Sequence, residues 1–192
     1  SASLKPSNSS VGTPSFLQWE SDSQLEISGD AGSDFSEALA LADLDGDGRQ
    51  DIIVGAPRTD NSRGAVYVFS GDVDSSSITH LDANLTLNGS LNYGSAHAGD
   101  VLSSGDIDGD GYIDLLIAAS EADGLDVEAG AVFLWSGSNS ILDGTVDNLD
   151  NSQAVFLGES YIGWAGSSLS VLDLDSDGQS ELVIGSPNAD TT

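Results

Sequence analysis

DLDGDGRQD, at residues 43–51, is the stretch that decides the fold of this chain, because it recurs as DIDGDGYID at residues 106–114 and as DLDSDGQSE at residues 173–181. Carboxylates occupy positions 1, 3, 5 and 9 of each copy, and a glycine occupies position 6. Alternate residues of such a loop turn their oxygens inward, and the glycine takes a sharp turn that a Cβ would obstruct. Carboxylates held so close together repel one another unless a cation lies between them. The three loops therefore predict three Ca²⁺ sites.

Each predicted site takes four side chains and one backbone carbonyl from its loop. The carbonyl comes from position 7, which explains why the side chain there varies among Arg49, Tyr112 and Gln179. The predicted carboxylate ligands are Asp43, Asp45, Asp47 and Asp51 in the first loop, Asp106, Asp108, Asp110 and Asp114 in the second, and Asp173, Asp175, Asp177 and Glu181 in the third. The third loop departs most from the pattern, with Ser176 in place of a glycine and Glu181 in place of an aspartate.

The residues around the loops exclude a helical EF-hand. An EF-hand needs a bidentate glutamate at position 12 and a helix on each side, but position 12 here is Val54, Ile117 or Ile184. Each loop is preceded by a short apolar segment and followed by a short, mostly β-branched run that ends at glycine or alanine. Such runs are typical of buried strands, so each loop is predicted to join two strands.

Composition limits the classes of partner. The chain has 32 acidic residues against 4 basic ones, a formal net charge of −28, and three Ca²⁺ ions would add +6 and leave −22. This charge disfavours nucleic acid and anionic membrane surfaces as partners. No stretch approaches the ~20 apolar residues of a membrane span, so membrane insertion is not expected. Cysteine is absent, and loops of this type suit the millimolar Ca²⁺ outside cells, so an extracellular or cell-surface location is expected.

The repeat is larger than the loop. The three loops begin 63 and 67 residues apart, at Asp43, Asp106 and Asp173. A third strand is predicted at residues 64–71 and 130–137, and a fourth at residues 85–89 and 154–158. Four strands in each repeat of about 60 residues indicate an all-β fold, a β-propeller of four-stranded antiparallel blades with about three blade equivalents in this chain.

The sequence resembles the FG-GAP repeats of integrin alpha-chain β-propellers and their bacterial relatives over about residues 15–190. The name describes a Phe-Gly pair before the loop and Gly-Ala-Pro after it. This chain has Phe35-Ser36, Tyr93-Gly94 and Ile162-Gly163 at the first place, and Gly55-Ala56-Pro57, Ala118-Ala119-Ser120 and Gly185-Ser186-Pro187 at the second. The resemblance implies a non-enzymatic module of a seven-bladed propeller.

The repeat pattern divides the chain into a lead-in and four blade segments. Residues 1–14 are expected to be a flexible lead-in. Residues 15–29 are expected to form strands three and four of a split blade, residues 30–89 blade 1, residues 90–158 blade 2, and residues 159–192 strands one and two of the split blade. Two interpretations follow: a piece of a larger propeller, or a homodimer in which two chains exchange their N-terminal strands and close a six-bladed ring.

Other residues give no sign of catalysis. His80 and His97 lie in different parts of the repeat without metalloprotease spacing, and no nucleophile-elbow or phosphate-loop motif occurs, so we do not expect an enzyme. Arg58 and Arg63 are interpreted as partners of nearby aspartates. Trp135 is interpreted as part of the core of its repeat.

The sequence thus predicts an extracellular calcium-binding β-propeller module for adhesion or for binding a protein or carbohydrate ligand, with structural Ca²⁺. Two alternatives stay open. One is a part of a secreted propeller enzyme, because fold does not decide function. The other is a self-assembling unit in which two chains close one six-bladed propeller.

Overall fold

The structure is a computed structural model, and it describes residues 25–189. Two antiparallel sheets of four strands each follow one another along the chain, and a two-stranded hairpin follows them. The first sheet contains β2 (Leu39–Ala42), β3 (Asp51–Gly55), β4 (Ala65–Phe69) and β6 (Leu85–Asn88); the second contains β7 (Leu102–Gly105), β8 (Asp114–Ala119), β9 (Ala131–Trp135) and β11 (Ala154–Leu157); the hairpin consists of β12 (Ser168–Leu172) and β13 (Glu181–Gly185).

The pairing register is the same in all three repeats. The last residue of the strand before each acidic loop pairs with the acidic residue at position 9 of that loop. The pairs are Ala42 with Asp51, Gly105 with Asp114, and Leu172 with Glu181. Because side chains alternate between the two faces of a strand, this shared register sends equivalent side chains to equivalent faces. The expected four-strand order is confirmed in the first two repeats.

Two short strands were not expected from the sequence. β5 (Ser77–Thr79) and β10 (Thr145–Asn148) each lie between the third and fourth strands of their own repeat. β10 pairs in parallel with β6 of the first sheet, which becomes five-stranded. β5 pairs in parallel with β1 (Glu26–Ser28), which lies where the fourth strand was expected within residues 15–29. The third strand expected earlier in that range lies outside the described residues.

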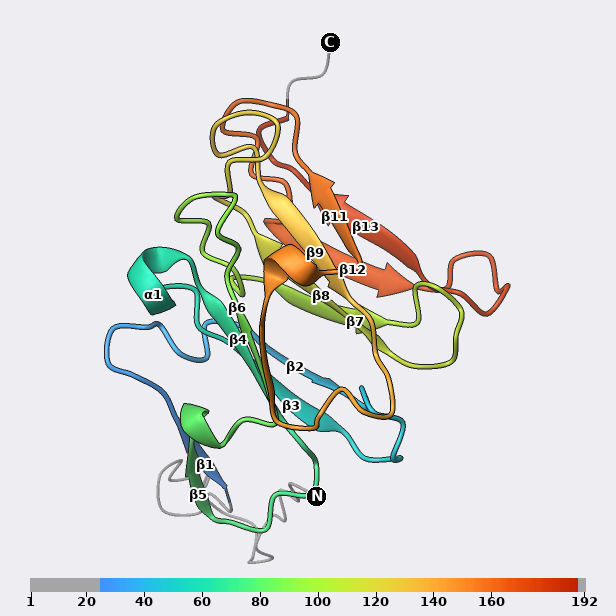
Figure 1. The fold of residues 1–192 in the computed structure, drawn as a ribbon. Coiled ribbons are helices and arrows are strands. Elements are labelled where there is room, and N and C mark those ends of the chain that lie inside the picture. Colours follow the sequence, from blue (N-terminus) through green and yellow to red (C-terminus); the bar gives the residue numbers. More distant parts are fainter. Residues whose placement is uncertain (1–24, 190–192) are drawn as a thin grey trace, which may run out of the picture.

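Figure 1 shows these sheets stacked from lower left to upper right, in the order β1–β5, first sheet, second sheet and β12–β13. Apolar side chains fill the spaces between neighbouring sheets. In the largest core cluster, Ile53 of the first sheet packs with side chains of the second sheet, among them Ile117, Phe133 and Trp135. The prediction that Trp135 belongs to the core is therefore confirmed.

Two further clusters complete the stack. One lies on the other face of the first sheet, where Ile27 of β1 packs together with Val54 and Tyr67. The other joins the second sheet to the β12–β13 hairpin, through side chains such as Leu116 and Leu169. Each sheet is thus held to its neighbours by apolar contacts on its faces.

Two glycines allow neighbouring sheets to approach closely. Gly64 and Gly130 have φ angles of +86° and +90° and form isolated parallel bridges to Ala98 and Ala165. A Cβ on Gly64 would lie 2.1 Å from the Ala98 carbonyl oxygen, and one on Gly130 would lie 2.2 Å from that of Ala165. Only glycine tolerates both this φ and this contact. Glycine at this position therefore allows the same close contact between neighbouring sheets in both repeats.

The remaining elements are short. They are the helix α1 (Thr59–Ser62) and the 3-10 helices η1 (His80–Asp82) and η2 (Leu149–Asn151). No helix among residues 25–189 is long and apolar enough to cross a membrane. The expectation of an all-β chain is confirmed for this part of the sequence.

Candidate metal centres

The three acidic loops lie on one side of the molecule, at the right in Figure 1. Each connects the first and second strands of its repeat: β2 to β3, β7 to β8, and β12 to β13. Because the hairpins share one register, the loops repeat the same geometry at successive levels of the stack.

Carboxylates at positions 1, 3 and 9 converge in every loop. In each group, one oxygen from each of the three residues lies within 4.8 Å of the others. The groups are Asp43, Asp45 and Asp51; Asp106, Asp108 and Asp114; and Asp173, Asp175 and Glu181. Three anionic oxygens at this separation form a donor set suited to a hard divalent cation such as Ca²⁺.

The position-1 aspartate holds the glycine turn of each loop. The N–H groups of Gly48, Gly111 and Gly178 donate to Oδ2 of the position-1 aspartates at 2.9, 3.0 and 3.0 Å. In the first loop, the other oxygen of Asp43, Oδ1, is buried and accepts no hydrogen bond from the described residues. A buried carboxylate oxygen without a donor is costly unless a cation contacts it, so the first loop fits a metal ligand at this atom.

Position 9 is the most enclosed ligand in the first two loops. Asp51 and Asp114 are fully buried. Asp51 accepts hydrogen bonds from Leu44 N at 2.9 Å and Gly71 N at 3.1 Å. Burial raises the pKa of Asp51 above its usual value, although these two backbone donors oppose the rise.

Asp114 repeats this arrangement in the second loop. It accepts from Ile107 N at 2.9 Å and from Gly137 N at 3.1 Å, and burial again raises its pKa. Gly71 and Gly137 each follow the third strand of their repeat, so a complete blade anchors the closing carboxylate. Sequence reasoning missed this role, although Ser-Gly after the third strand at matched positions was a usable signal.

Glu181 lacks the second anchor. It is partly exposed and accepts from Leu174 N at 2.6 Å. Among the described residues no third strand pairs with β13, and no N–H equivalent to that of Gly71 or Gly137 reaches Glu181. The third loop therefore brings its carboxylates together without the support that the other two receive.

Position 5 stands outside the three converging groups. Asp47, Asp110 and Asp177 instead accept hydrogen bonds from the N–H groups of the position-7 residues, each at 2.8 Å. These bonds orient the backbone of Arg49, Tyr112 and Gln179, whose carbonyls are the predicted fifth ligands. The ligand role of position 5 stays a prediction.

Neighbouring loops touch one another through positions 4 and 7. A Cβ added to Gly46 would lie 3.0 Å from Cε1 of Tyr112, and one added to Gly109 would lie 2.9 Å from Cγ of Gln179. The position-7 side chain of one loop thus covers the position-4 glycine of the loop before it. The sequence pattern alone did not reveal this contact, because it joins residues more than 60 positions apart.

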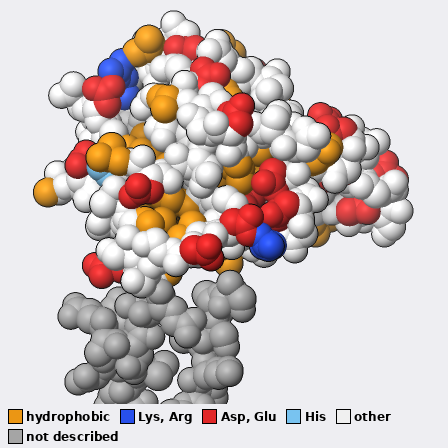
Figure 2. Space-filling model, turned by 60° about the horizontal axis from the view of Figure 1, so that its bottom comes forward, with side chains coloured by type: hydrophobic (Ala, Val, Ile, Leu, Met, Phe, Trp, Pro, Cys, Tyr) orange, Lys and Arg blue, Asp and Glu red, His pale blue; other side chains and the backbone are white. Residues whose placement is uncertain are grey.

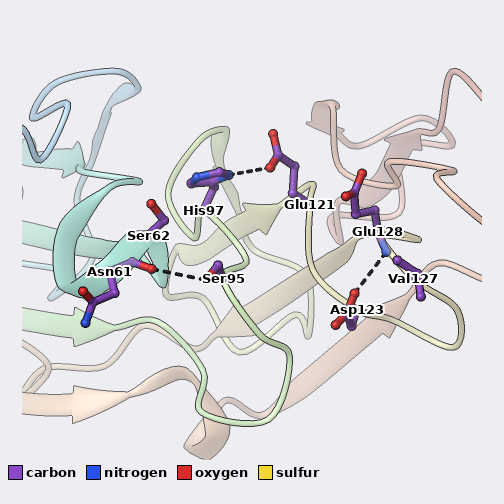
Figure 3. A pocket seen from close by; sticks show the side chains of 8 residues that line it. All are labelled: Asn61, Ser62, Ser95, His97, Glu121, Asp123, Val127 and Glu128. Carbon is purple, nitrogen blue, oxygen red and sulfur yellow. Dashed lines mark hydrogen bonds and ion pairs between the residues drawn. The ribbon is translucent and has the colours of Figure 1, made fainter.

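A polar cavity of about 390 Å³ lies among loops elsewhere on the molecule (Figure 3). His97 Nδ1 lies 2.9 Å from Glu121 Oε2, and Ser95 Oγ donates to Asn61 O at 3.2 Å. On the other side of the cavity, Asp123 Oδ1 accepts a hydrogen bond from Glu128 N at 3.2 Å.

The two arginines interpreted as partners of aspartates form these pairs. Arg58 contacts Asp34 at 2.7 Å, and Arg63 contacts Asp60. Both contacts are local. They involve loops other than the acidic ones, away from the candidate metal centres.

Four-stranded antiparallel sheets, stacked face to face with an acidic loop between the first two strands of each, define a repeat protein of the β-propeller class. The family model for the FG-GAP repeat matches residues 35–69, 98–135 and 165–192. The chain belongs to the FG-GAP repeat family, and its fold is an integrin alpha-like β-propeller fold.

Curated relatives agree with this family. Integrin alpha-4 of Xenopus laevis is 34% identical over 158 residues, covering 80% of this chain and 14% of that protein. Integrin alpha-5 of Xenopus laevis is 31% identical over 175 residues, covering 82% and 15%. Phosphatidylinositol-glycan-specific phospholipase D of Homo sapiens is 30% identical over 157 residues, covering 80% and 18%. The chain therefore spans less than a fifth of the length of these relatives.

Proposed function

We propose that this chain is an extracellular calcium-binding propeller module for adhesion or for binding a protein ligand, in which Ca²⁺ is structural. The observation that carries the proposal is the convergence of three carboxylates in the same loop of three successive FG-GAP repeats. Integrin alpha chains among the relatives support a role in recognition at the cell surface. A carbohydrate is the other class of ligand compatible with this proposal.

Ca²⁺ would supply positive charge that holds the two strands of each hairpin together at their loop. The ligands would be the carboxylates of positions 1, 3 and 9, with the position-7 carbonyl and the position-5 side chain completing the oxygen set. The buried Asp43 Oδ1 supports this assignment in the first loop, because it has no donor among the described residues. The −28 net charge adds a general reason to bind cations.

The blade boundaries belong to the same proposal. Residues 30–89 and 90–158 would each form one blade, and residues 15–29 and 159–192 would supply two halves of a split blade. The parallel pairing of β1 with β5 supports this division, because β6 of the first sheet pairs with β10 in the same way.

A second candidate is a part of a secreted propeller enzyme. The match to a phospholipase D supports it, because FG-GAP-like sequence also occurs in that protein. Activity of this chain alone towards a phosphodiester substrate would favour the enzyme, whereas binding without turnover would favour the module.

The test is a calorimetric titration of metal-free protein with Ca²⁺, compared with the variant D45N/D108N/D175N, which changes position 3 in every loop. We expect about three ions per chain for the unchanged protein, one for each loop, and a large loss of affinity for the variant. Unchanged binding by the variant would contradict the ligand assignment, and no binding by the unchanged protein at millimolar Ca²⁺ would contradict the proposed function.

A further inference from the structure

Two neighbouring N–H groups of the second repeat reach two different candidate metal centres. Gly137 and Ser138 lie just after β9, the third strand of that repeat. Gly137 N donates to Asp114 Oδ1 at 3.1 Å and so holds the closing carboxylate of the second loop. Ser138 N donates at 3.1 Å to the carbonyl of Leu44, which is position 2 of the first loop. One short segment therefore contacts both loops.

Leu44 in turn lies among the predicted ligands of the first loop. It stands between Asp43 and Asp45, and its N–H donates to Asp51 Oδ2 at 2.9 Å. Its side chain is fully buried in the core cluster that also contains Trp135, the last residue of β9. The second repeat thus holds Leu44 by its backbone and by its side chain, and Leu44 holds the closing carboxylate of the first loop.

The second and third loops are joined differently. Ser180 N, at position 8 of the third loop, donates to Asp106 O at 2.7 Å. Within residues 25–189, no backbone N–H reaches the carbonyl of Ile107, the residue equivalent to Leu44. Ile107 is only partly buried, and the equivalent Leu174 of the third loop is 62% exposed. The link made by residues 137–138 is therefore specific to the first two loops in the described part of the chain.

We propose that residues 137–138 couple the first two candidate metal centres, so that Ca²⁺ in the second loop increases the Ca²⁺ affinity of the first, with Ser138 as a positioning residue. An ion in the second loop fixes Asp114 and with it the adjacent N–H groups of residues 137–138. The backbone of Leu44 is then held before the first loop takes its ion, so less ordering remains for that step. This inference rests on the proposed function, because it needs Ca²⁺ in the loops.

Electrostatic interaction between the two loops has the opposite sign. Figure 2 shows many acidic and few basic side chains on the surface, a background that attracts cations in general. In the variant D108N, an empty second loop keeps three carboxylates and a charge of −3, whereas the filled loop of the unchanged protein has four carboxylates and one ion, a charge of −2. Charge alone would therefore strengthen Ca²⁺ binding at the first loop in D108N, while the proposed coupling weakens it.

The test is an NMR titration of metal-free, ¹⁵N-labelled protein with Ca²⁺, which follows each loop separately. One amide in each loop reports on its own site, because it donates to the position-1 aspartate of that loop. These amides belong to Gly48, Gly111 and Gly178.

The variant D108N has a matched control in D175N, which makes the same change at position 3 of the third loop. Asp108 Oδ1 accepts from Asp110 N at 3.1 Å, and Asp175 Oδ1 accepts from Asp177 N at 3.2 Å. An asparagine oxygen keeps either hydrogen bond while it removes one charge. Folding of the whole chain driven by Ca²⁺ would affect the two variants alike, so a difference between them isolates the link through residues 137–138.

We expect the Ca²⁺ concentration that half-saturates the first loop to rise at least about fivefold in D108N and to change little in D175N. Because coupling is reciprocal, D45N should weaken binding at the second loop by the same factor. S138P removes the N–H that reaches Leu44 and should also weaken binding at the first loop, whereas S138A keeps this N–H and should not. The comparison of D108N with D175N stands by itself if S138P does not fold.

A half-saturating concentration for the first loop that is unchanged or lower in D108N, or that rises equally in D108N and D175N, would overturn the coupling. Equal losses of affinity in S138P and S138A would overturn the role of the Ser138 N–H. Both results leave Ca²⁺ binding itself intact. Amide signals of the unchanged protein that do not respond to millimolar Ca²⁺ would instead contradict the proposed function.

Discussion

The strands β8 and β13 follow equivalent acidic loops, yet their surroundings differ. β8 is buried along its whole length between β7 and β9, whereas β13 is mostly half-buried and pairs with β12 alone among the described residues. Asp114 at the start of β8 accepts two backbone hydrogen bonds, and Glu181 at the start of β13 accepts one from Leu174. The loop sequence is thus sufficient to gather three carboxylates, but a third strand is needed to bury and anchor the closing one.

The largest expected effect comes from removing Ca²⁺. If each site is filled at ~10 to 100 times its dissociation constant, each contributes about 1.4 to 2.7 kcal/mol by mass action. Excess EGTA should therefore lower the melting temperature strongly, with the third repeat contributing least. Thermal unfolding with and without chelator measures this, and an unchanged melting temperature would contradict a structural role.

Changing the closing carboxylate should separate the second loop from the third. In Ca²⁺, D114N should cost about 2–3 kcal/mol because a charged acceptor of two hydrogen bonds is lost, while E181Q should cost about 1 kcal/mol or less because its site is more exposed. Urea unfolding measures both losses of unfolding free energy, and equal losses would contradict the comparison.

The same pair should behave differently in chelator. Burial raises the pKa of Asp114, so without metal its ionised form destabilises the fold, and this penalty grows as the pH rises from the usual aspartate pKa to the raised one. D114N removes the charge, so its cost at neutral pH should shrink in EGTA. A cost that stays the same with and without Ca²⁺ would argue against a metal ligand at Asp114.

The strand-three anchor gives a smaller effect. A Cβ on Gly137 would lie 2.3 Å from Ile113 O, so G137A should displace the anchor of Asp114 and cost about 1–3 kcal/mol. G144A is the control, because a Cβ there meets nothing within 4 Å although its φ is +90°. Ca²⁺ affinity, measured by calorimetric titration, should fall for G137A and not for G144A. Equal Ca²⁺ affinities of the two variants would show that the segment after the third strand does not support the metal site.

The smallest effect should come from the contact between loops. Y112A removes the ring that covers Gly46 and should weaken Ca²⁺ binding at the first loop slightly, by less than about 1 kcal/mol. The same titration of L91A, an exposed leucine away from the loops, serves as its control. A tenfold or larger loss in Y112A would show stronger coupling between loops than this contact explains.

The sequence was most informative where the structure is local. Spacing predicted the acidic loops, the strands on each side of them and the four-strand order, because these depend on residues close together in the chain. It did not predict β5 and β10, which pair with strands of another repeat or of the chain's beginning, or the anchoring of Asp51 by Gly71. The ligand role of Asp47 stays a prediction, because the group that converges in the first loop contains positions 1, 3 and 9.

The most direct test of the central claim is a crystal structure of the protein grown with Ca²⁺, with the anomalous signal used to locate the ions. The account predicts an ion in each loop, about 2.3–2.6 Å from oxygens of positions 1, 3 and 9 and from the position-7 carbonyl. Loops without ions at millimolar Ca²⁺ would contradict it.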